Sequence, residues 1–242
     1  MGRSFCNSNC TPDSLVSFRR RNYVLDGAIL VATGVDHSSF VKEVEGALQE
    51  IPTSLPIESN EAPVVFVGGE ARLFTPAGGV AHVAVSVHSS AAVDYATRSV
   101  LKHCLSLSTN SRSSGISAFA VPGLVGVYGS SPSEEAGALT DSLLSTIGTP
   151  PSNDIITRAK LNAKAEALFA IENGSKSLAE IMTMNVLHTG SFTAASVAAA
   201  FDGITNKDIN EAFAATKKTG LSLAAVGEIQ NVPPHRVISS KF

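Results

Sequence analysis

The stretch Val64–Val87, VVFVGGEARLFTPAGGVAHVAVSV, decides the fold of this 242-residue chain. Its two apolar runs, Val64–Val67 and His82–Val87, are rich in β-branched residues, which favour strands. A Gly-Gly pair at 68–69 and the segment Pro76–Gly79 lie between these runs, and both are turn signals. The pattern predicts a first strand, a bend, a polar crossing and a second strand, which together open a domain.

Helix and strand signals alternate from this stretch to the C-terminus. Apolar residues at helical spacing and capping residues predict the helices, and short β-branched runs predict the strands. The predicted helices are Ala91–Leu107, Ser133–Ile147 with Ser133 as its cap, Ser152–Ile171, Ser177–His188, Thr193–Phe201 and Lys207–Lys217. The predicted strands are Ile116–Val121, Leu124–Tyr128 and Leu221–Val226. We expect the first two of these strands to form a hairpin through Pro122-Gly123.

The part before the opening stretch predicts a helix, a strand and a second helix. Thr11-Pro12 suits a helix start, with Leu15, Phe18 and Tyr23 facing a core. Leu25–Gly34 predicts a strand, and Asp36 caps a helix that runs through Leu48.

Three prolines and no apolar periodicity in residues 51–63 predict a linker. The predicted organisation is therefore residues 1–50, a linker at 51–63, and a domain from 64 to 242.

Composition and charge exclude several classes of protein. The net charge of −3 and the absence of Trp argue against a nucleic-acid partner. No apolar run approaches the roughly 20 residues that span a bilayer. The cysteines, Cys6, Cys10 and Cys104, do not form a disulfide framework, and we interpret them as ordinary thiols of a reducing compartment.

Two segments of the chain echo each other. Thr11–Asp36 and Thr205–Gln230 each start with a Thr cap, continue as a helix carrying Phe, and end in a small-residue strand that finishes with Gly. The front of the chain is therefore interpreted as the tail of a first repeat, and the rest as a complete second repeat.

Four segments carry a resemblance to the two-repeat M16 (pitrilysin-type) family. They are AILVATGVDHSSF (Ala28–Phe40), VGGEARLFTPAGGVAHVAVSV (Val67–Val87), ITRAKLNAKAEALFAIENGSKSLAEI (Ile156–Ile181) and LSLAAVGEIQNVP (Leu221–Pro233). Their order and spacing match the end of the first M16 domain, the linker and all of the second domain.

The resemblance implies an α+β fold: a mixed, mainly antiparallel sheet with helices on one face, preceded by a helix-strand-helix remnant. Within the family, the sequence is most similar to the core subunits of the mitochondrial cytochrome bc1 complex. This implies a non-catalytic scaffold that pairs with a core protein 1-like M16 subunit on the matrix side of the inner membrane. It also implies no haem, quinone or metal in this chain.

The spacing of the histidines bears on whether this chain could hold the zinc ion of active members. Those members resemble inverted zincins, in which H-x-x-E-H supplies two zinc ligands and a general base. None of the six histidines here lies in that pattern; they are His37, His82, His88, His103, His188 and His235. His82 and His88 fall on the same side of a strand, and we interpret them as packing or edge residues. No catalytic, cofactor or metal residue is therefore assigned.

The loop Leu105–Ser117, LSLSTNSRSSGIS, bears on two alternatives. The non-zinc, substrate-binding subunit of a mitochondrial processing peptidase carries a glycine-rich loop at the corresponding place. This segment has one glycine, and Ser and Asn lack glycine's backbone freedom. That departure favours the bc1 subunit. A zinc peptidase whose catalytic half lies on another chain stays a third hypothesis.

Overall fold

The computed structural model describes two compact units. Its described residues are 10–25, 28–49, 66–76, 78–89, 94–109, 115–121, 123–189, 192–218 and 220–242. Unit 1 comprises the described residues of Met1–Val64 and Ala170–Phe192, and unit 2 comprises those of Val65–Phe169 and Thr193–Phe242. The predicted linker at 51–63 lies outside the described residues.

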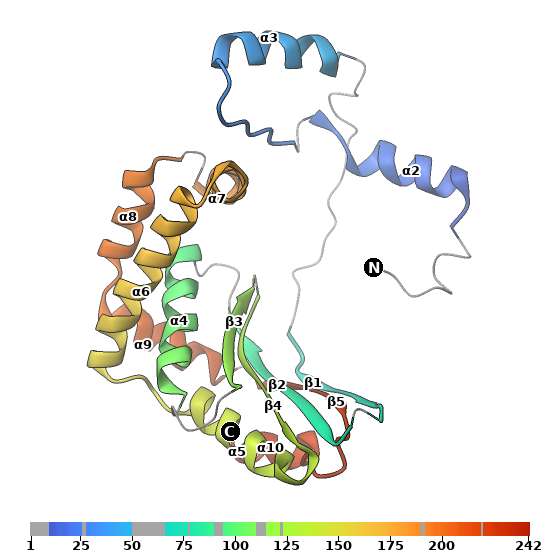
Figure 1. Cartoon of the computed structure of the whole chain (residues 1–242), viewed down its shortest axis with the longest axis vertical. Helices are drawn as coiled ribbons and strands as arrows, with labels where there is room; N and C mark the ends of the chain where they lie inside the picture. The colour runs from blue at the N-terminus through green and yellow to red at the C-terminus, as the bar shows by residue number, and fades with distance from the viewer. Residues whose placement is uncertain are drawn as a thin grey trace. The chain divides into compact units, whose positions relative to one another are not determined.

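Unit 2 contains a five-stranded sheet and most of the helices (Figure 1). Its strands are β1 (Gly69–Phe74), β2 (Val80–His88), β3 (Ser117–Val121), β4 (Leu124–Pro132) and β5 (Leu221–Gly227). Its helices are α4 (Tyr95–Ser108), the short 3-10 helix η2 (Ser133–Glu135), α5 (Ala136–Gly148), α8 (Ala194–Gly203), α9 (Asn206–Thr216) and α10 (His235–Ser239). Helix α6 (Asn153–Glu172) begins in unit 2 and ends in unit 1.

The sheet is mixed and mainly antiparallel, as the sequence predicts. Its strand order is β1-β5-β2-β4-β3. Only the β1–β5 pair is parallel, while β2 pairs antiparallel with both β5 and β4, and β4 pairs antiparallel with β3. The hairpin predicted between the third and fourth strands is present, and Gly123 after Pro122 has a positive φ of 87°. The last strand of the chain therefore lies inside the sheet, between its first and second strands.

The position of the first strand corrects the sequence prediction. Val64 lies outside the described residues, while Phe66 and Val67 are outside any strand and Val67 is 87% exposed. The strand is instead Gly69–Phe74, the segment predicted as a polar crossing. Charged residues suit this edge position, since an edge strand is open to solvent on one side.

The core of unit 2 lies between one face of the sheet and its helices. On β2, Ala81, Val83, Val85 and Val87 are all at most 1% exposed, and alternate residues point the other way. Each fully buried valine or leucine contributes about 1.5–3 kcal/mol to folding. Helices α4 and α5 pack on this face of the sheet.

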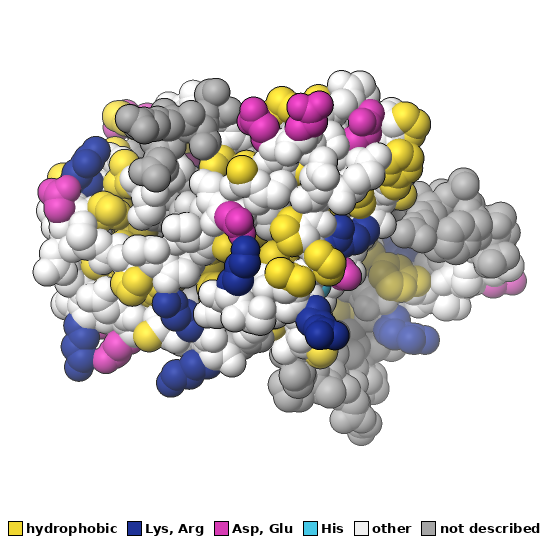
Figure 2. Space-filling model, turned by 90° about the horizontal axis from the view of Figure 1, so that it is seen from below, with side chains coloured by type: hydrophobic (Ala, Val, Ile, Leu, Met, Phe, Trp, Pro, Cys, Tyr) yellow, Lys and Arg dark blue, Asp and Glu magenta, His cyan; other side chains and the backbone are white. Residues whose placement is uncertain are grey.

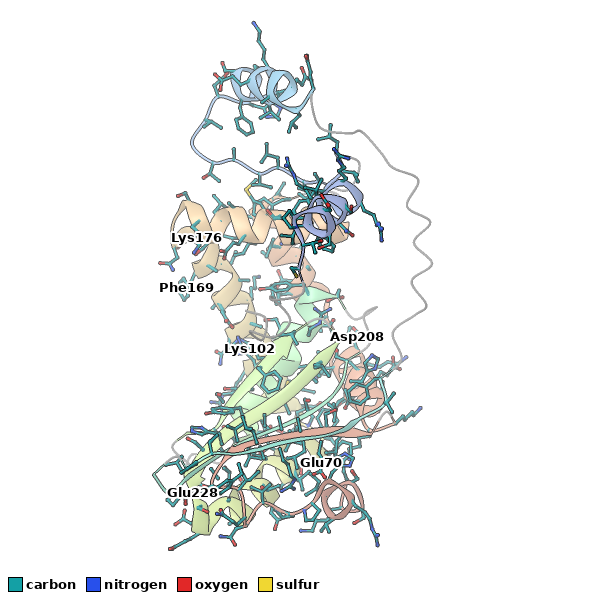
Figure 3. All side chains as sticks on the ribbon, turned by 90° about the vertical axis from the view of Figure 1, so that its right-hand side faces the viewer. Glu70, Lys102, Phe169, Lys176, Asp208 and Glu228 are labelled. Atoms are coloured by element: carbon teal, nitrogen blue, oxygen red, sulfur yellow. The ribbon has the colours of Figure 1, made fainter. Side chains whose placement is uncertain are left out.

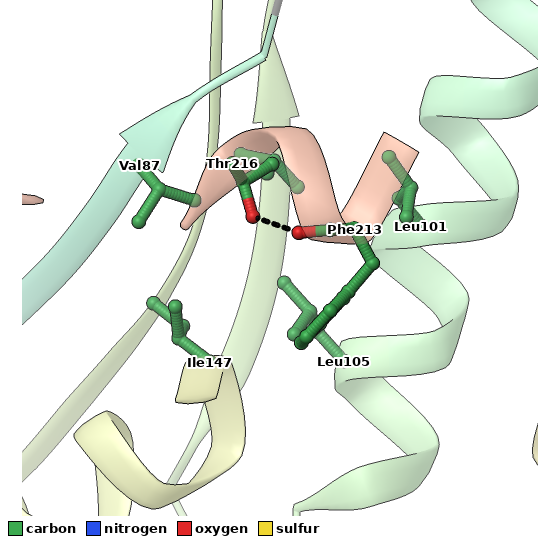
Figure 4. A pocket seen from close by; sticks show the side chains of 7 residues that line it. Val87, Leu101, Leu105, Ile147, Phe213 and Thr216 are labelled. Atoms are coloured by element: carbon green, nitrogen blue, oxygen red, sulfur yellow. Dashed lines mark hydrogen bonds between the residues drawn. The ribbon is translucent and has the colours of Figure 1, made fainter. Parts of the chain in front are cut away.

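A small void of about 10 Å³ lies in this core, where β2 meets α4, α5 and α9 (Figure 4). Its lining is apolar except for Thr216, whose hydroxyl donates to the Phe213 carbonyl at 2.7 Å. This hydrogen bond satisfies the one polar side chain of the lining, which a buried hydroxyl requires.

Helix caps follow the predictions in part. Thr205 and Asp208 form the predicted capping box of α9, with the Asp208 carboxylate accepting the Thr205 N–H at 2.8 Å. Ser133 was wrongly predicted as a cap. Its hydroxyl donates to the Glu228 carbonyl at 2.8 Å, so it fastens the start of η2 to the chain after β5.

Unit 1 contains the helices α2 (Pro12–Asn22), α3 (His37–Leu48) and α7 (Ser175–Thr189). The predicted caps Thr11 and Asp36 are present. The strand predicted over Leu25–Gly34 was wrong, since the described part from Ala28 onward is irregular. A strand needs a neighbour for its backbone hydrogen bonds, and all five strands of the described residues lie in unit 2.

The apolar side chains of α2 do not enter a core, contrary to the prediction. Leu15, Phe18 and Tyr23 are 57%, 59% and 68% exposed. Ile29 and Leu30 are exposed as well. An open groove of about 460 Å³ in this unit is lined mainly by residues 29–45. Within the described residues of unit 1, apolar side chains of α2 and of the segment before α3 are therefore exposed.

Replacing Gly126 with Ala tests the packing of the central strands. A Cβ at this position would come within 2.5 Å of the Val85 carbonyl oxygen and 2.7 Å of the Phe119 ring. We expect Gly126→Ala to lower the free energy of unfolding by about 1–3 kcal/mol, measured by chemical denaturation. Gly148→Ala is the control, because nothing lies within 4 Å of its added Cβ. Equal stability of the two variants would contradict the described packing.

Candidate functional surface

The face of the sheet opposite the packed helices forms a continuous surface, which we call the open face. Strand pairing places alternate residues of all five strands side by side on it. Its members are Leu73, Ser222, Ala224, Val226, His82, Ala84, Ser86, His88, Tyr128, Phe119 and Val121. Three of its apolar side chains, Leu73, Val121 and Val226, are more than 40% exposed.

A histidine and a tyrosine pair at one end of the open face. His82 of β2 and Tyr128 of β4 are diagonal neighbours across the strand pair, and their rings stack with centroids 6.1 Å apart. The His82 Nδ1 lies 2.7 Å from the Tyr128 hydroxyl. The two polar groups therefore satisfy each other on an otherwise weakly polar surface.

A second histidine-aromatic pair occupies the other end of β2. His88 stacks on Phe66, with the ring centroids 5.5 Å apart. Because His82 and His88 are six residues apart on one strand, their backbones are roughly 20 Å apart. The two imidazoles cannot share a metal ion at that separation. The interpretation of both as packing residues therefore agrees with the geometry.

The centre of the open face is lined by small side chains. Ala84, Ser86 and Ala224 lie there, and Phe119 of β3 lies over Gly126 of β4. An aromatic ring over a glycine restores the cross-strand packing that glycine lacks. With small side chains at its centre and exposed apolar side chains around them, this surface is suited to contact with another protein surface.

Two further histidines, His37 and His103, take part in local structure. His37 is the first residue of α3, and His103 of α4 contacts Glu166. The side chain of His188 lies outside the described residues. Within the described part of the chain, no group of three or more His, Cys, Asp or Glu side chains could hold a metal ion.

The cysteines show no reactive environment in the part that the structure describes. Cys104 is 1% exposed, and burial raises the pKa of its thiol to about 12. It is therefore a protonated core residue. Cys10 is exposed, and Cys6 lies outside the described residues.

A polar clasp that the sequence analysis missed fastens β1 to the C-terminal segment. The Arg72 guanidinium donates to the Val232 carbonyl at 3.1 Å, to the Pro233 carbonyl, and to the Glu70 carboxylate at 2.8 Å. Glu70, labelled in Figure 3, also accepts the His235 N–H at 3.1 Å. Hydrogen bonds from Arg72 and then His235 hold the pKa of Glu70 below its ordinary value. No sequence signal links residues this far apart.

The loop that separates two of the functional hypotheses is described only in part. Residues 110–114 lie outside the described residues, so the prediction about peptide handling rests on the sequence. Among the described residues, no helix is long and apolar enough to cross a membrane.

Comparisons with known proteins agree on one family. Residues 9–163, more than half of the chain, match the family described as "Peptidase M16 inactive domain". The mitochondrial-processing peptidase subunit beta of Lentinula edodes is 30% identical over 235 residues, and the match covers 81% of this chain and 50% of that protein. The chain thus spans about half the length of this curated relative.

A solved structure has the same fold. A chain from the structure "Complex III2 from Candida albicans, Inz-5 bound" superposes with a TM-score of 0.79 at 15% sequence identity. The match covers 99% of this chain and 64% of that chain. At this identity the match establishes the fold.

Two valine-to-threonine substitutions test the assignment of the two faces. Val226 on the open face is 41% exposed, whereas Val127 on the helix-covered face is 0% exposed. Threonine keeps the shape of valine but adds a hydroxyl, which costs about 1–3 kcal/mol when buried without a partner. We expect Val127→Thr to lower the free energy of unfolding by that amount, and Val226→Thr to change it by less than about 0.5 kcal/mol. Chemical denaturation measures both, and a reversed order would refute the face assignment.

Proposed function

Because the chain belongs to the M16 peptidase family and matches the model of its inactive domain, we propose a role without catalysis. The proposed role is that of a core subunit of a mitochondrial cytochrome bc1 complex, of the core protein 2 type. In this role it supports the assembly and stability of the machinery that transfers electrons from ubiquinol to cytochrome c. The electron transfer itself takes place in other subunits.

The observation that carries this proposal is the fold match of nearly the whole chain to a chain of a complex III structure. That assembly is a respiratory complex, and a subunit in it must offer large surfaces to neighbours. The family model that matches is the one described as the inactive domain, which also supports a scaffold role.

The described surfaces also favour a scaffold. The open face and the uncovered apolar residues of unit 1 are suited to protein contacts. Figure 2 shows another part of the surface, where hydrophobic side chains are interspersed with charged ones. A mixture of this kind is the ordinary composition of a protein surface.

The proposed partners follow from this assignment. They are a core protein 1-like M16 subunit and other subunits of the bc1 complex. This chain would contact them on the matrix side of the inner membrane. We also propose that residues 1–50 are the end of a first M16-like domain, that 51–63 are the linker, and that 64–242 are the second domain.

A second candidate function is the non-zinc, substrate-binding subunit of a mitochondrial processing peptidase. The relative in Lentinula edodes is named as subunit beta of such an enzyme. The non-zinc, substrate-binding subunit is the alpha type, so this name supports the processing peptidase in general and not this subunit in particular. The loop Leu105–Ser117, with a single glycine, argues against it, because a flexible peptide-handling loop needs more backbone freedom.

Native electrophoresis separates the two functions. We expect the tagged chain, extracted from mitochondria in mild detergent, to migrate in one large band with cytochromes b and c1, identified by mass spectrometry. The physical reason is that the subunit buries its apolar surfaces against its neighbours and remains bound during separation.

A matrix protein with the same tag is the control, and it must be absent from that band. Migration in a smaller assembly with a partner that carries H-x-x-E-H, together with cleavage of a presequence peptide, would overturn the proposal and support the peptidase subunit.

A further inference from the structure

Helix α6 is the element that leads from unit 2 into unit 1. The boundary between the units falls inside this helix, between Phe169 and Ala170. Helix α7 follows after Asn173-Gly174, and the chain then returns to unit 2 at α8. The contacts that fasten α6 to unit 2 therefore lie before this boundary.

Apolar anchoring of α6 stops before this boundary. Ile156, Ala159 and Ala163 are fully buried, and Ala167 is 2% exposed. Between Leu168 and Val186, none of the side chains that the structure describes is buried. Phe169 itself is 68% exposed (Figure 3). Segments with few buried contacts are the ones that open locally without global unfolding.

The last side-chain contact that ties α6 to another helix of unit 2 is made by Glu166, whose carboxylate contacts two adjacent residues of α4. The Lys102 ammonium donates to the two oxygens of Glu166 at 2.8 and 3.0 Å. The His103 Nε2 lies 2.5 Å from one of the same oxygens. Earlier along α6, Lys164 binds Asp202 of α8 at 2.7 Å, and Lys160 donates to the Ile204 carbonyl. We call the contact of Lys102 and His103 with Glu166 the α4–α6 clamp.

We infer that the α4–α6 clamp is a hinge point: it holds the last turns of α6 on unit 2, and its release frees Leu168 through the end of α7 while the first turns of α6 remain docked. The earlier ties to α8 and the buried alanines keep those first turns in place. Hinges of this kind are a few residues at the end of an element.

The charge of Glu166 agrees with a closed clamp at neutral pH. Partial burial acts to raise the pKa of Glu166, but hydrogen bonds from Lys102 and His103 outweigh it and keep this pKa below its ordinary value. The charged or titratable groups of α4 around it are Lys102, His103 and Tyr95. The stabilisation is therefore fully present at neutral pH and is lost as pH falls through the lowered pKa.

Hydrogen exchange read by mass spectrometry tests the hinge in the full chain at pH 7. Removing the charge with Glu166→Gln weakens charge-assisted hydrogen bonds. We expect amides of residues 168–186 to exchange about tenfold faster, while residues 153–163 and strand β2 keep the wild-type rate. Lys102→Met is the milder variant and should accelerate the same amides about threefold.

Glu172→Gln is the matched control, because it makes the same change at an exposed acid on the same helix. It should leave all rates unchanged. Unchanged exchange at 168–186 in Glu166→Gln, or equal acceleration of β2, would overturn the inference, since the clamp would then contribute nothing locally or act on the whole fold. This readout is independent of complex assembly, so its failure does not bear on the proposed function.

Discussion

The pairing of β2 with both β4 and β5 is the constraint on which the rest of unit 2 depends. It fixes which residues of three strands face the helices, because a shift by one residue would turn every side chain to the opposite face. The valines of β2 then lie on the helix-covered face, while His82 and His88 stack on aromatic rings on the open face. One register thus separates the surface that stabilises the domain from the surface available to neighbours.

The sequence predicts the elements of unit 2 well where the pattern is local. Most helix boundaries follow from periodicity and capping residues, whereas the mixed sheet is what the family resemblance implies. The comparisons confirm the family and the fold. The errors concern tertiary partners. Gly69–Phe74 forms a strand because it pairs with β5 and contacts the C-terminal segment. Leu25–Gly34 forms no strand because it pairs with no strand among the described residues. Pattern alone does not reveal a partner more than 100 residues away.

The candidate surface was predictable only in outline. The period of two places His82 and His88 on one side of a strand, but the stacking on Tyr128 and Phe66 depends on strand order and loop path. In both pairs the imidazole stacks on an aromatic ring of another segment of the chain.

The insertion of β5 between β1 and β2 has a consequence for how the chain is made. When a ribosome delivers the chain from its N-terminus, β1 emerges more than 140 residues before the strand with which it pairs. Until then, β1 has no hydrogen-bonding partner in the sheet, and β2 has one free side. Non-local pairing of this kind slows folding and prolongs the exposure of strand edges. The protein is therefore most vulnerable to aggregation and most dependent on chaperones during delivery, before its last strand arrives.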